Sequence, residues 1–242
     1  MRSDMNPSVE IVKELAPAGA LRAGINLGNP VLAQGTPDDP RGVTVDLARE
    51  LAKRLRVPLE MTAFDAAGKT FEALRAGKLD LIFLAIEPVR ATEIEFTSPY
   101  VLIEGVYLVR QDSPLKEVSD VDRAGVRIGV NKNSAYDLFL TRTLKHAELV
   151  RGESGIKLFE QQKLEAAAGI RQPLTAYAKA HSEVRLIDGR FMEIRQAMGV
   201  PKGRLAAARY LRGFIEEMKA SGFVTDALRR SNQADATVAP PE

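Results

Sequence analysis

Short apolar runs alternate along the chain with segments of helical periodicity, and this alternation limits the possible folds more than any other feature. Residues 79–85 (LDLIFLA) are almost wholly apolar, as expected of a strand buried in a parallel sheet. Two helical patterns precede this run, and Thr44 is the predicted N-cap of the first. The first third of the chain is therefore predicted to be an α/β layered unit, with strands at 21–25, 59–63 and 79–85 and helices at 45–55 and 71–75.

The pattern restarts after the polar stretch 111–125, which contains Pro114 and several Asp residues. The expected strands are 101–110, 126–130, 164–168 and 191–198, and the expected helices are 135–144, 173–180, 205–219 and 224–230. Because the last two helices have no sheet of their own, we expect them to pack on the first sheet. This predicts two α/β lobes, 1–109 with 195–242 and 110–194, joined by two crossovers with a cleft between them. The tail 233–242 is expected to be loose.

Charge and residue content exclude several classes of protein. Lys and Arg number 34 and Asp and Glu 32, so the net charge is only +2 and no nucleic-acid partner is expected. Cysteine is absent and histidine occurs twice, so neither thiol catalysis nor a multi-histidine metal site is expected. No apolar run approaches the roughly 18 residues that span a bilayer. The first residues lack a secretory-signal pattern, so we expect either a cytoplasmic protein or one whose signal has been removed.

Several short motifs occur in an order typical of one protein family: LRAGIN (21–26), GVTVDLARELAKRL (42–55), ALRAGKLDLIFLAI (73–86), VRATEIEFTSPY (89–100), VRIGVNKNSA (126–135) and MKASGFVTDAL (218–228). The chain resembles the type II periplasmic solute-binding proteins of ABC importers, in the polar amino-acid-binding branch (bacterial extracellular solute-binding family 3). The resemblance implies two α/β lobes joined by two hinge strands, with a small carboxylate or amino-acid-like ligand held in the interlobe cleft. It also implies a periplasmic monomer that serves an inner-membrane ABC permease and needs no cofactor.

Arg90 follows the buried strand at 79–85, in a loop that a parallel sheet places at its carboxyl edge. A guanidinium binds a carboxylate through two parallel hydrogen bonds, which makes arginine a suitable anion clamp. The alternative is a surface arginine paired with Glu93 or Glu87. The resemblance implies that Arg90 grips the α-carboxylate of the ligand, and Ala85 and Glu87 are further site candidates in the same segment.

A second candidate region joins a predicted strand to a predicted helix at 131–135. The resemblance implies a ligand-binding loop here, which makes Lys132, Asn133 and Ser134 site candidates. Free N–H groups at a helix N-terminus attract anions, and the Ser134 hydroxyl is a further donor. The alternative is that Ser134 only caps its helix.

Three positions depart from the family pattern. Asn26 stands where an acidic residue is usual, Glu87 replaces a threonine, and Arg171 lies where an aspartate takes the ligand ammonium group. An unpaired arginine in a desolvated cleft needs an anion, so a carboxylic or dicarboxylic acid is expected to bind better than a neutral amino acid. The alternatives are that Arg171 turns to solvent or pairs with Glu165, or that Glu87 takes the ammonium group.

Two other classes of function remain alternatives to a non-enzymatic binding protein. One is an enzyme resembling cyclohexadienyl dehydratase, which needs a carboxyl group of raised pKa in the cleft; Glu87 and Glu165 are the candidates. The other is a sensor or effector-binding domain on the same fold. No helix-turn-helix precedes residue 21, and this disfavours a transcription regulator.

Overall fold

The computed structural model describes residues 7–242, which divide into two compact units. The first unit extends to Leu102 and resumes at Arg195, and the second comprises Ile103–Ile194. The chain passes between them twice, in β6 (Ile94–Arg110) and β11 (Met192–Pro201). The boundary expected after residue 109 falls inside β6, a strand that belongs to both units. No helix among residues 7–242 combines the length and apolar character that a membrane crossing requires.

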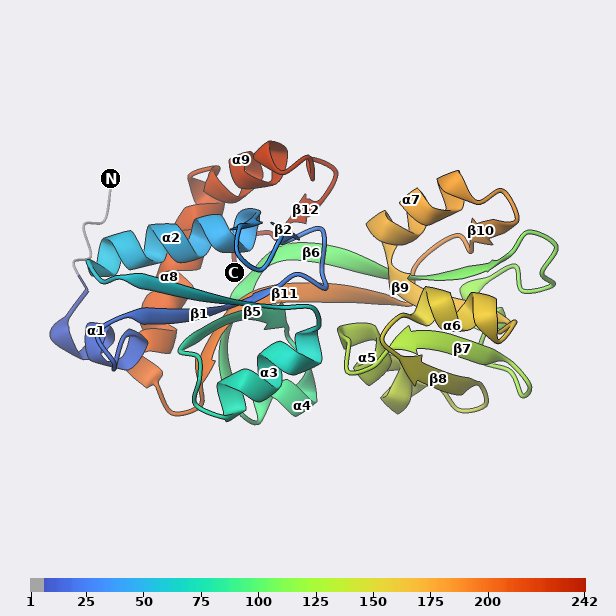
Figure 1. Cartoon of the computed structure of the whole chain (residues 1–242), viewed down its shortest axis with the longest axis horizontal. Coiled ribbons are helices and arrows are strands. Elements are labelled where there is room, and N and C mark those ends of the chain that lie inside the picture. The colour runs from blue at the N-terminus through green and yellow to red at the C-terminus, as the bar shows by residue number, and fades with distance from the viewer. Residues whose placement is uncertain (1–6) are drawn as a thin grey trace. The chain divides into compact units, whose positions relative to one another are not determined.

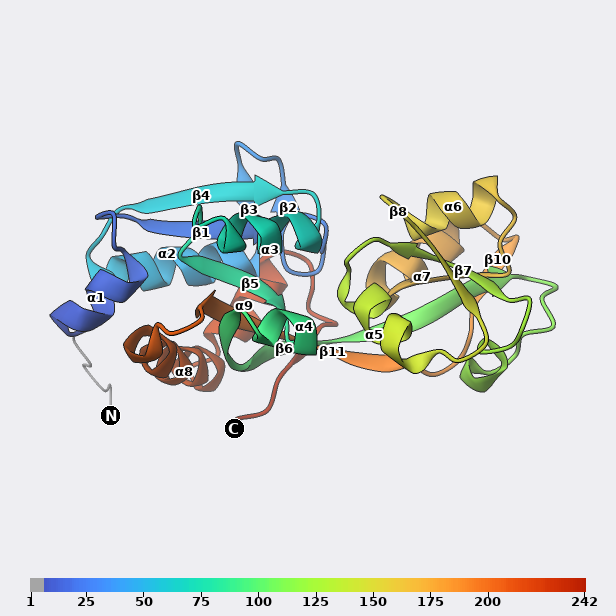
Figure 2. The same ribbon diagram turned by 90° about the horizontal axis from the view of Figure 1, so that it is seen from below.

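The first unit is built on the strand order β4-β1-β5-β11, in which β1 runs parallel to β4 and β5 and β11 runs antiparallel to β5. Helix α2 covers one face of these strands and α3 the other (Figures 1 and 2). Besides β6 and β11, the elements of the first unit are α1 (Val9–Leu15), β1 (Leu21–Asn26), β2 (Gln34–Gly35), β3 (Pro40–Arg41), α2 (Val43–Leu55), β4 (Leu59–Phe64), α3 (Ala67–Arg75), β5 (Leu81–Ala85), α4 (Pro88–Ala91), α8 (Leu205–Ala220), α9 (Phe223–Arg230) and β12 (Thr237–Val238).

The sequence pattern explains the core of this unit. All five residues of β5 are buried, as the apolar run predicts, and α2 buries Leu47, Leu51 and Leu55 at the expected spacing of four. The predicted N-cap is wrong, because α2 begins at Val43 and its N-cap is Gly42, with φ of 113°. Thr44 lies within the helix, and its hydroxyl donates to the carbonyl of Leu32 at 3.2 Å. Thr44 therefore bonds to the preceding loop and does not cap the helix.

The C-terminal tail is ordered, contrary to the expectation of a loose end. β12 pairs antiparallel with β6, with Thr237 opposite Leu102. The N–H of Ala239 donates to the carbonyl of Tyr100 at 3.0 Å, and the Ala239 side chain is buried. The tail's few apolar residues and its backbone groups therefore complete the edge of the first unit.

The second unit has the strand order β6-β9-β7-β8, in which β7 is parallel to β8 and β9, and β9 is antiparallel to β6. Its core cluster includes Val106 and Phe159, with α6 packed against the strands. Between β6 and β7 the connection contains a short 3-10 helix, Val118–Asp120. The remaining elements are β7 (Arg127–Asn131), α5 (Ala135–Thr143), β8 (Glu148–Gly152), α6 (Gly155–Gln161), β9 (Ala166–Ile170), α7 (Arg171–Ala180) and β10 (Val184–Leu186).

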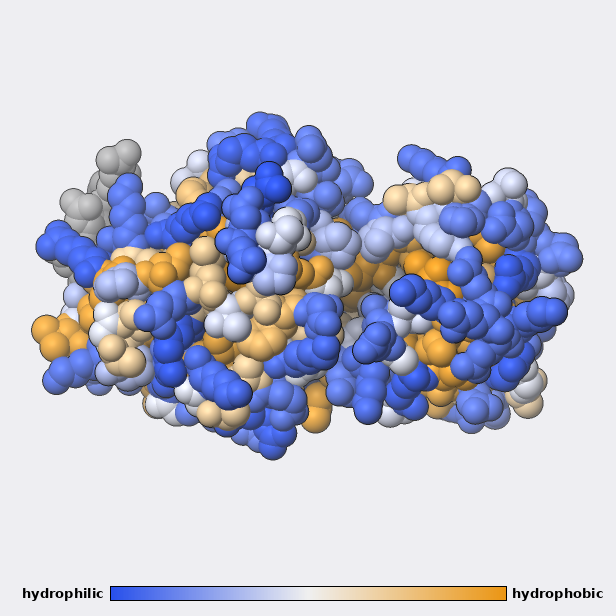
Figure 3. All heavy atoms as spheres, in the orientation of Figure 1, coloured by the Kyte–Doolittle hydropathy of each residue, from blue (hydrophilic) through white to orange (hydrophobic). Residues whose placement is uncertain are grey.

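Hydrophilic side chains predominate on the face drawn in Figure 3, with hydrophobic atoms showing between them on each unit. Large hydrophobic side chains exposed in the described part of the chain include Val9, Val89 and Leu205. Single exposed apolar residues of this kind are normal on protein surfaces.

Candidate functional site

Arg90 lies in α4, a single turn that begins at Pro88 directly after β5. Its side chain is buried, with 1% of the residue exposed, and its Nη1 donates to the carbonyl of Ala85 at 3.2 Å. Burial lowers the pKa of the Arg90 guanidinium to about 10, and the negative charge of Glu87 opposes that shift. A buried cation of this kind is stable only with anionic or carbonyl partners around it.

Glu87 is the carboxylate whose charge acts on Arg90. The residue is 2% exposed and is the N-cap of α4, where its carbonyl accepts from the N–H of Arg90 at 3.0 Å and of Ala91 at 2.9 Å. Glu93, the other partner considered from the sequence, instead lies 3.4 Å from Nε of Arg75. The first unit therefore brings one buried carboxylate and one buried guanidinium into the same turn.

Asn26 ends β1 at the same edge of the sheet at which Ala85 ends β5. The two strands are parallel neighbours, so their carboxyl ends lie side by side. The Asn26 Oδ1 accepts from the N–H of Gly28 at 3.0 Å, and this bond shapes the turn that follows the strand. The structure thus gathers Asn26, Ala85, Glu87 and Arg90 at the carboxyl edge of the first unit's sheet.

The loop after β7 in the second unit is held by several hydrogen bonds. Ser134 caps α5, its Oγ accepting from the N–H of Asp137 at 3.1 Å. Asn133 has φ of 60°, and its N–H donates to Oδ2 of Asp137 at 2.8 Å. The Lys132 N–H donates to the carbonyl of Gly152 at 2.8 Å, and its side chain is exposed. The capping interpretation of Ser134 is therefore observed, and the loop is fixed by its own unit.

Arg171, the first residue of α7, already has an anionic partner. Its Nε pairs with the carboxylate of Glu104 in β6, and its Nη2 donates to the carbonyl of Gly189 at 2.6 Å. Glu165, the partner suggested from the sequence, instead pairs with Arg127 at 2.9 Å. The prediction of an unpaired Arg171 and the alternative of an Arg171–Glu165 pair are therefore both wrong. Because Arg171 is paired with Glu104, it gives no evidence for an extra ligand carboxylate.

Glu104 is the residue that the sequence interpretation missed. It precedes Gly105, which pairs with Ile170 across the antiparallel β6–β9 ladder, so it lies next to the start of α7. It also meets Arg190 at 3.3 Å. A 67-residue separation between Glu104 and Arg171 gives no local signal, and only the strand register brings the two together. Among residues 7–242, no group of three or more His, Cys, Asp and Glu side chains is placed to hold a metal ion.

Two α/β units, with the chain passing from one to the other twice, define the fold of type II periplasmic binding proteins. The family model of bacterial extracellular solute-binding proteins, family 3, matches residues 21–231. The chain therefore belongs to this family.

One relative and two solved structures are similar to this chain over most of its length. The amino-acid-binding protein AabA of Dichelobacter nodosus is 22% identical over 209 residues, which cover 83% of this chain and 82% of that protein. The solute receptor for L-cysteine of Neisseria gonorrhoeae superposes with a TM-score of 0.76 and 23% identity, covering 91% of this chain and 92% of that one. The ancestral amino-acid-binding protein AncCDT-1, a precursor of cyclohexadienyl dehydratase, gives 0.73 and 21%, covering 90% and 97%. The two solved structures establish similarity of fold.

Proposed function

We propose that this chain is the solute-binding component of an ABC importer and that its ligand is an amino acid or a closely related carboxylate. Family membership and an amino-acid-binding relative over most of the chain support this function. The proposal includes a periplasmic location, a monomeric state and delivery of the ligand to an inner-membrane ABC permease. It assigns the protein a binding role without catalysis.

The observation that carries the proposal is the buried guanidinium of Arg90 at the carboxyl edge of the first unit's sheet. Its bond to the Ala85 carbonyl orients the side chain, whose planar guanidinium fork carries five N–H donors. A ligand carboxylate accepts from such a fork through two parallel bonds. Burial strengthens these bonds, because little water competes for the charge.

Glu87 makes an amino acid a better ligand than its deaminated analogue. Its buried carboxylate is close enough to Arg90 for the two charges to interact, so the pair matches the two charges of a zwitterion. Arg171 gives no reason to prefer a dicarboxylate, because Glu104 neutralises it. We therefore propose that Arg90 binds the α-carboxylate and Glu87 the α-ammonium group, with Asn26 and the carbonyl of Ala85 beside them.

The proposal for the second unit concerns the loop after β7 and the start of α7. Lys132 and Asn133 are exposed there, and Ser134 presents a hydroxyl at the N-terminus of the nine-residue helix α5. These groups are donors suited to a ligand carboxylate, and the positive end of the helix adds to their effect. Arg171 is assigned a supporting role through its pair with Glu104.

Calorimetric titration of an L-amino acid and its deaminated analogue, side by side, tests the proposed function. Arg90→Ala should weaken binding of the amino acid by about 2–5 kcal/mol, the range for truncating a buried, hydrogen-bonded charge. Arg90→Lys should also bind weakly, since the fork is lost. Arg212→Ala, a change at an exposed arginine on α8, is the matched control and should bind as the wild type does.

Unchanged affinity in Arg90→Ala would contradict the carboxylate clamp. Glu87→Gln separates the two halves of the proposal, because it should remove the preference for the amino acid over its analogue while Arg90 still binds the carboxylate. Stronger binding of the deaminated analogue by the wild type would contradict the role of Glu87 and leave that of Arg90 intact.

The dehydratase-like alternative loses one of its two candidate acids. Hydrogen bonds from Arg127 hold the pKa of the Glu165 carboxyl below its usual range, so Glu165 is ionised at neutral pH and cannot donate a proton. Glu87 is the remaining carboxyl group, and the proposed binding role accounts for it.

A further inference from the structure

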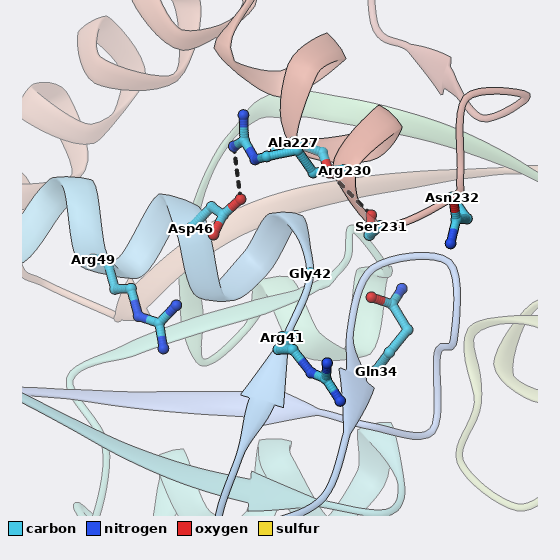
Figure 4. A pocket seen from close by; sticks show the side chains of 9 residues that line it. All are labelled: Gln34, Arg41, Gly42, Asp46, Arg49, Ala227, Arg230, Ser231 and Asn232. Atoms are coloured by element: carbon cyan, nitrogen blue, oxygen red, sulfur yellow. Dashed lines mark hydrogen bonds and ion pairs between the residues drawn. The ribbon is translucent and has the colours of Figure 1, made fainter.

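A pocket whose residues are remote in sequence from Arg90 lies wholly within the first unit. It has a volume of about 500 Å³ and is formed by the start of α2, the β2–β3 hairpin, the end of α9 and the two residues after it. Figure 4 shows Gln34 and Arg41 on the β2–β3 hairpin, Arg49 on α2, and Arg230 on α9 with its side chain turned toward Asp46. Hydrophilic residues gather over α9 on the face seen in Figure 3.

The lining of this pocket carries an excess of positive charge. Three of its residues are arginines, and Asp46 is its one carboxylate, which pairs with Arg230 at 2.8 Å. Within the described residues, Arg49 has no carboxylate in ion-pair contact. Two positive charges of the lining are thus left without a carboxylate inside the pocket.

Arg41 has only a weak competitor outside the pocket. It lies 3.6 Å from Asp39, and both side chains are about 70% exposed (69% and 72%). Exposed ion pairs of this kind contribute little and exchange readily with other partners. Arg41 can therefore turn to an anion in the pocket without breaking a structural contact.

We propose that this pocket binds a dianionic phosphate group, either free phosphate or a phosphate monoester, through Arg41 and Arg49, with Arg230 held beside them by Asp46. Guanidinium groups match the geometry of phosphate oxygens and bind them through paired hydrogen bonds. A phosphate monoester carries about −1.5 to −2 charges at pH 7, which matches the two uncompensated positive charges. A carboxylate supplies only one.

Two further features of the pocket fit this ligand. Gln34 and Asn232 supply side-chain amides that can donate to phosphate oxygens or to hydroxyl groups of an ester. Gly42, the N-cap of the 13-residue helix α2, is also in the lining, so the positive end of the helix dipole adds to the arginine charges. The volume exceeds what phosphate alone requires, so the organic part of a small monoester has room as well.

Calorimetric titration at constant ionic strength tests the proposal, with inorganic phosphate, glycerol 3-phosphate and acetate as titrants. The wild type should bind at least one phosphate compound and bind acetate far more weakly; binding of glycerol 3-phosphate would show that the pocket accepts a monoester. Arg49→Gln should weaken phosphate binding about tenfold or more, the expected loss of a charge-assisted hydrogen bond. Arg212→Gln removes the same charge from an exposed site on α8 outside the pocket and should have no effect.

Several results would overturn the proposal: no binding of either phosphate compound, equal binding of acetate, or equal losses in Arg49→Gln and Arg212→Gln. Loss of phosphate binding in Arg90→Ala would also overturn it, because phosphate would then occupy the site of the proposed amino acid. If Arg49→Gln fails to fold, Arg41→Gln takes its place, with the same expected loss. Melting curves of each variant without ligand identify such a failure.

Discussion

The buried carboxylate of Asp80 accepts ionic contacts from two arginines of the first unit. It is fully buried just before β5 and accepts from Nε and Nη2 of Arg22 in β1 at 2.7 and 2.9 Å. Arg204, the N-cap of α8, adds a third contact at 2.9 Å and also donates to the carbonyl of Glu14 at 2.6 Å. Through Arg204, Asp80 thereby links the sheet to α8 and α1. Burial alone would raise the pKa of the Asp80 carboxyl, but both arginines outweigh burial and hold that pKa below its usual value.

We expect Asp80→Asn to lower the free energy of unfolding at pH 7 by about 3 kcal/mol, the scale for removing one partner of a buried ionic contact. Because the pKa is depressed in the folded state, the stabilisation is complete above the ordinary value of 3.8 and is lost as pH falls through the folded pKa. The difference between wild type and variant should therefore narrow below about pH 4 in urea titrations. Asp226→Asn, at an exposed pair with Arg229, should change stability by less than about 1 kcal/mol. A difference that stays constant from pH 7 to pH 3 would contradict this assignment.

Single residues of the candidate site differ in how well the sequence predicts them. The position of Arg90 was predictable because the residue follows a recognisable buried strand, and its place at the carboxyl edge follows from strand direction. Its role in binding a ligand stays a prediction. The environment of Arg171 was not predictable, because Glu104 reaches it only through the register of two antiparallel strands. Local patterns identify candidate side chains, whereas the charge around them depends on pairings between distant segments.

At the scale of elements, we expect removal of residues 236–242 to destabilise the first unit. The truncation removes β12, the bond from Ala239 to Tyr100, and the bond from Nζ of Lys219 to the carbonyl of Pro240 at 2.9 Å. At least three lost hydrogen bonds predict a decrease in unfolding free energy of about 3 kcal/mol, measurable by urea denaturation. Glu242→Gln, which removes only the half-exposed pair with Arg195, is the control and should have little effect. Equal stability of the truncated and full-length chains would mean that the tail is loose, as the sequence suggested.

Elements with strong periodicity were predictable, and elements that depend on a distant partner were not. The pattern predicts β1 and α8 to within one or two residues, because their apolar residues recur at the spacing of a strand or a helix. It misses the start of β6 at Ile94, since the polar residues of that segment mask its pairing. It also misses the two-residue strand β12, which exists only because β6 offers a free edge. The parallel pairing of β1, β4 and β5 was inferred correctly from the helices that connect these strands.

At the scale of the whole molecule, each unit has a hydrophobic core of its own. A cluster around Leu79 and Ile82 supports the first unit, and a cluster around Leu108 and Phe159 supports the second. The chain passes from one unit to the other in the two long strands β6 and β11. We therefore expect a ligand to stabilise each unit through the residues of that unit that bind it.

Hydrogen exchange followed by mass spectrometry can measure this effect unit by unit. At about a hundredfold excess over its dissociation constant, a bound amino acid should stabilise the segments that hold it by up to about 2.7 kcal/mol. We expect slower exchange in peptides covering 81–91, which contain Ala85, Glu87 and Arg90, and in peptides covering 131–137, which contain Asn133 and Ser134. Arg90→Ala should abolish the protection in both sets at the same ligand concentration, because affinity is lost as a whole. Protection of 81–91 alone would contradict the proposed role of the second unit's loop and leave that of Arg90 intact. Protection that persists in Arg90→Ala would place the ligand elsewhere in the molecule.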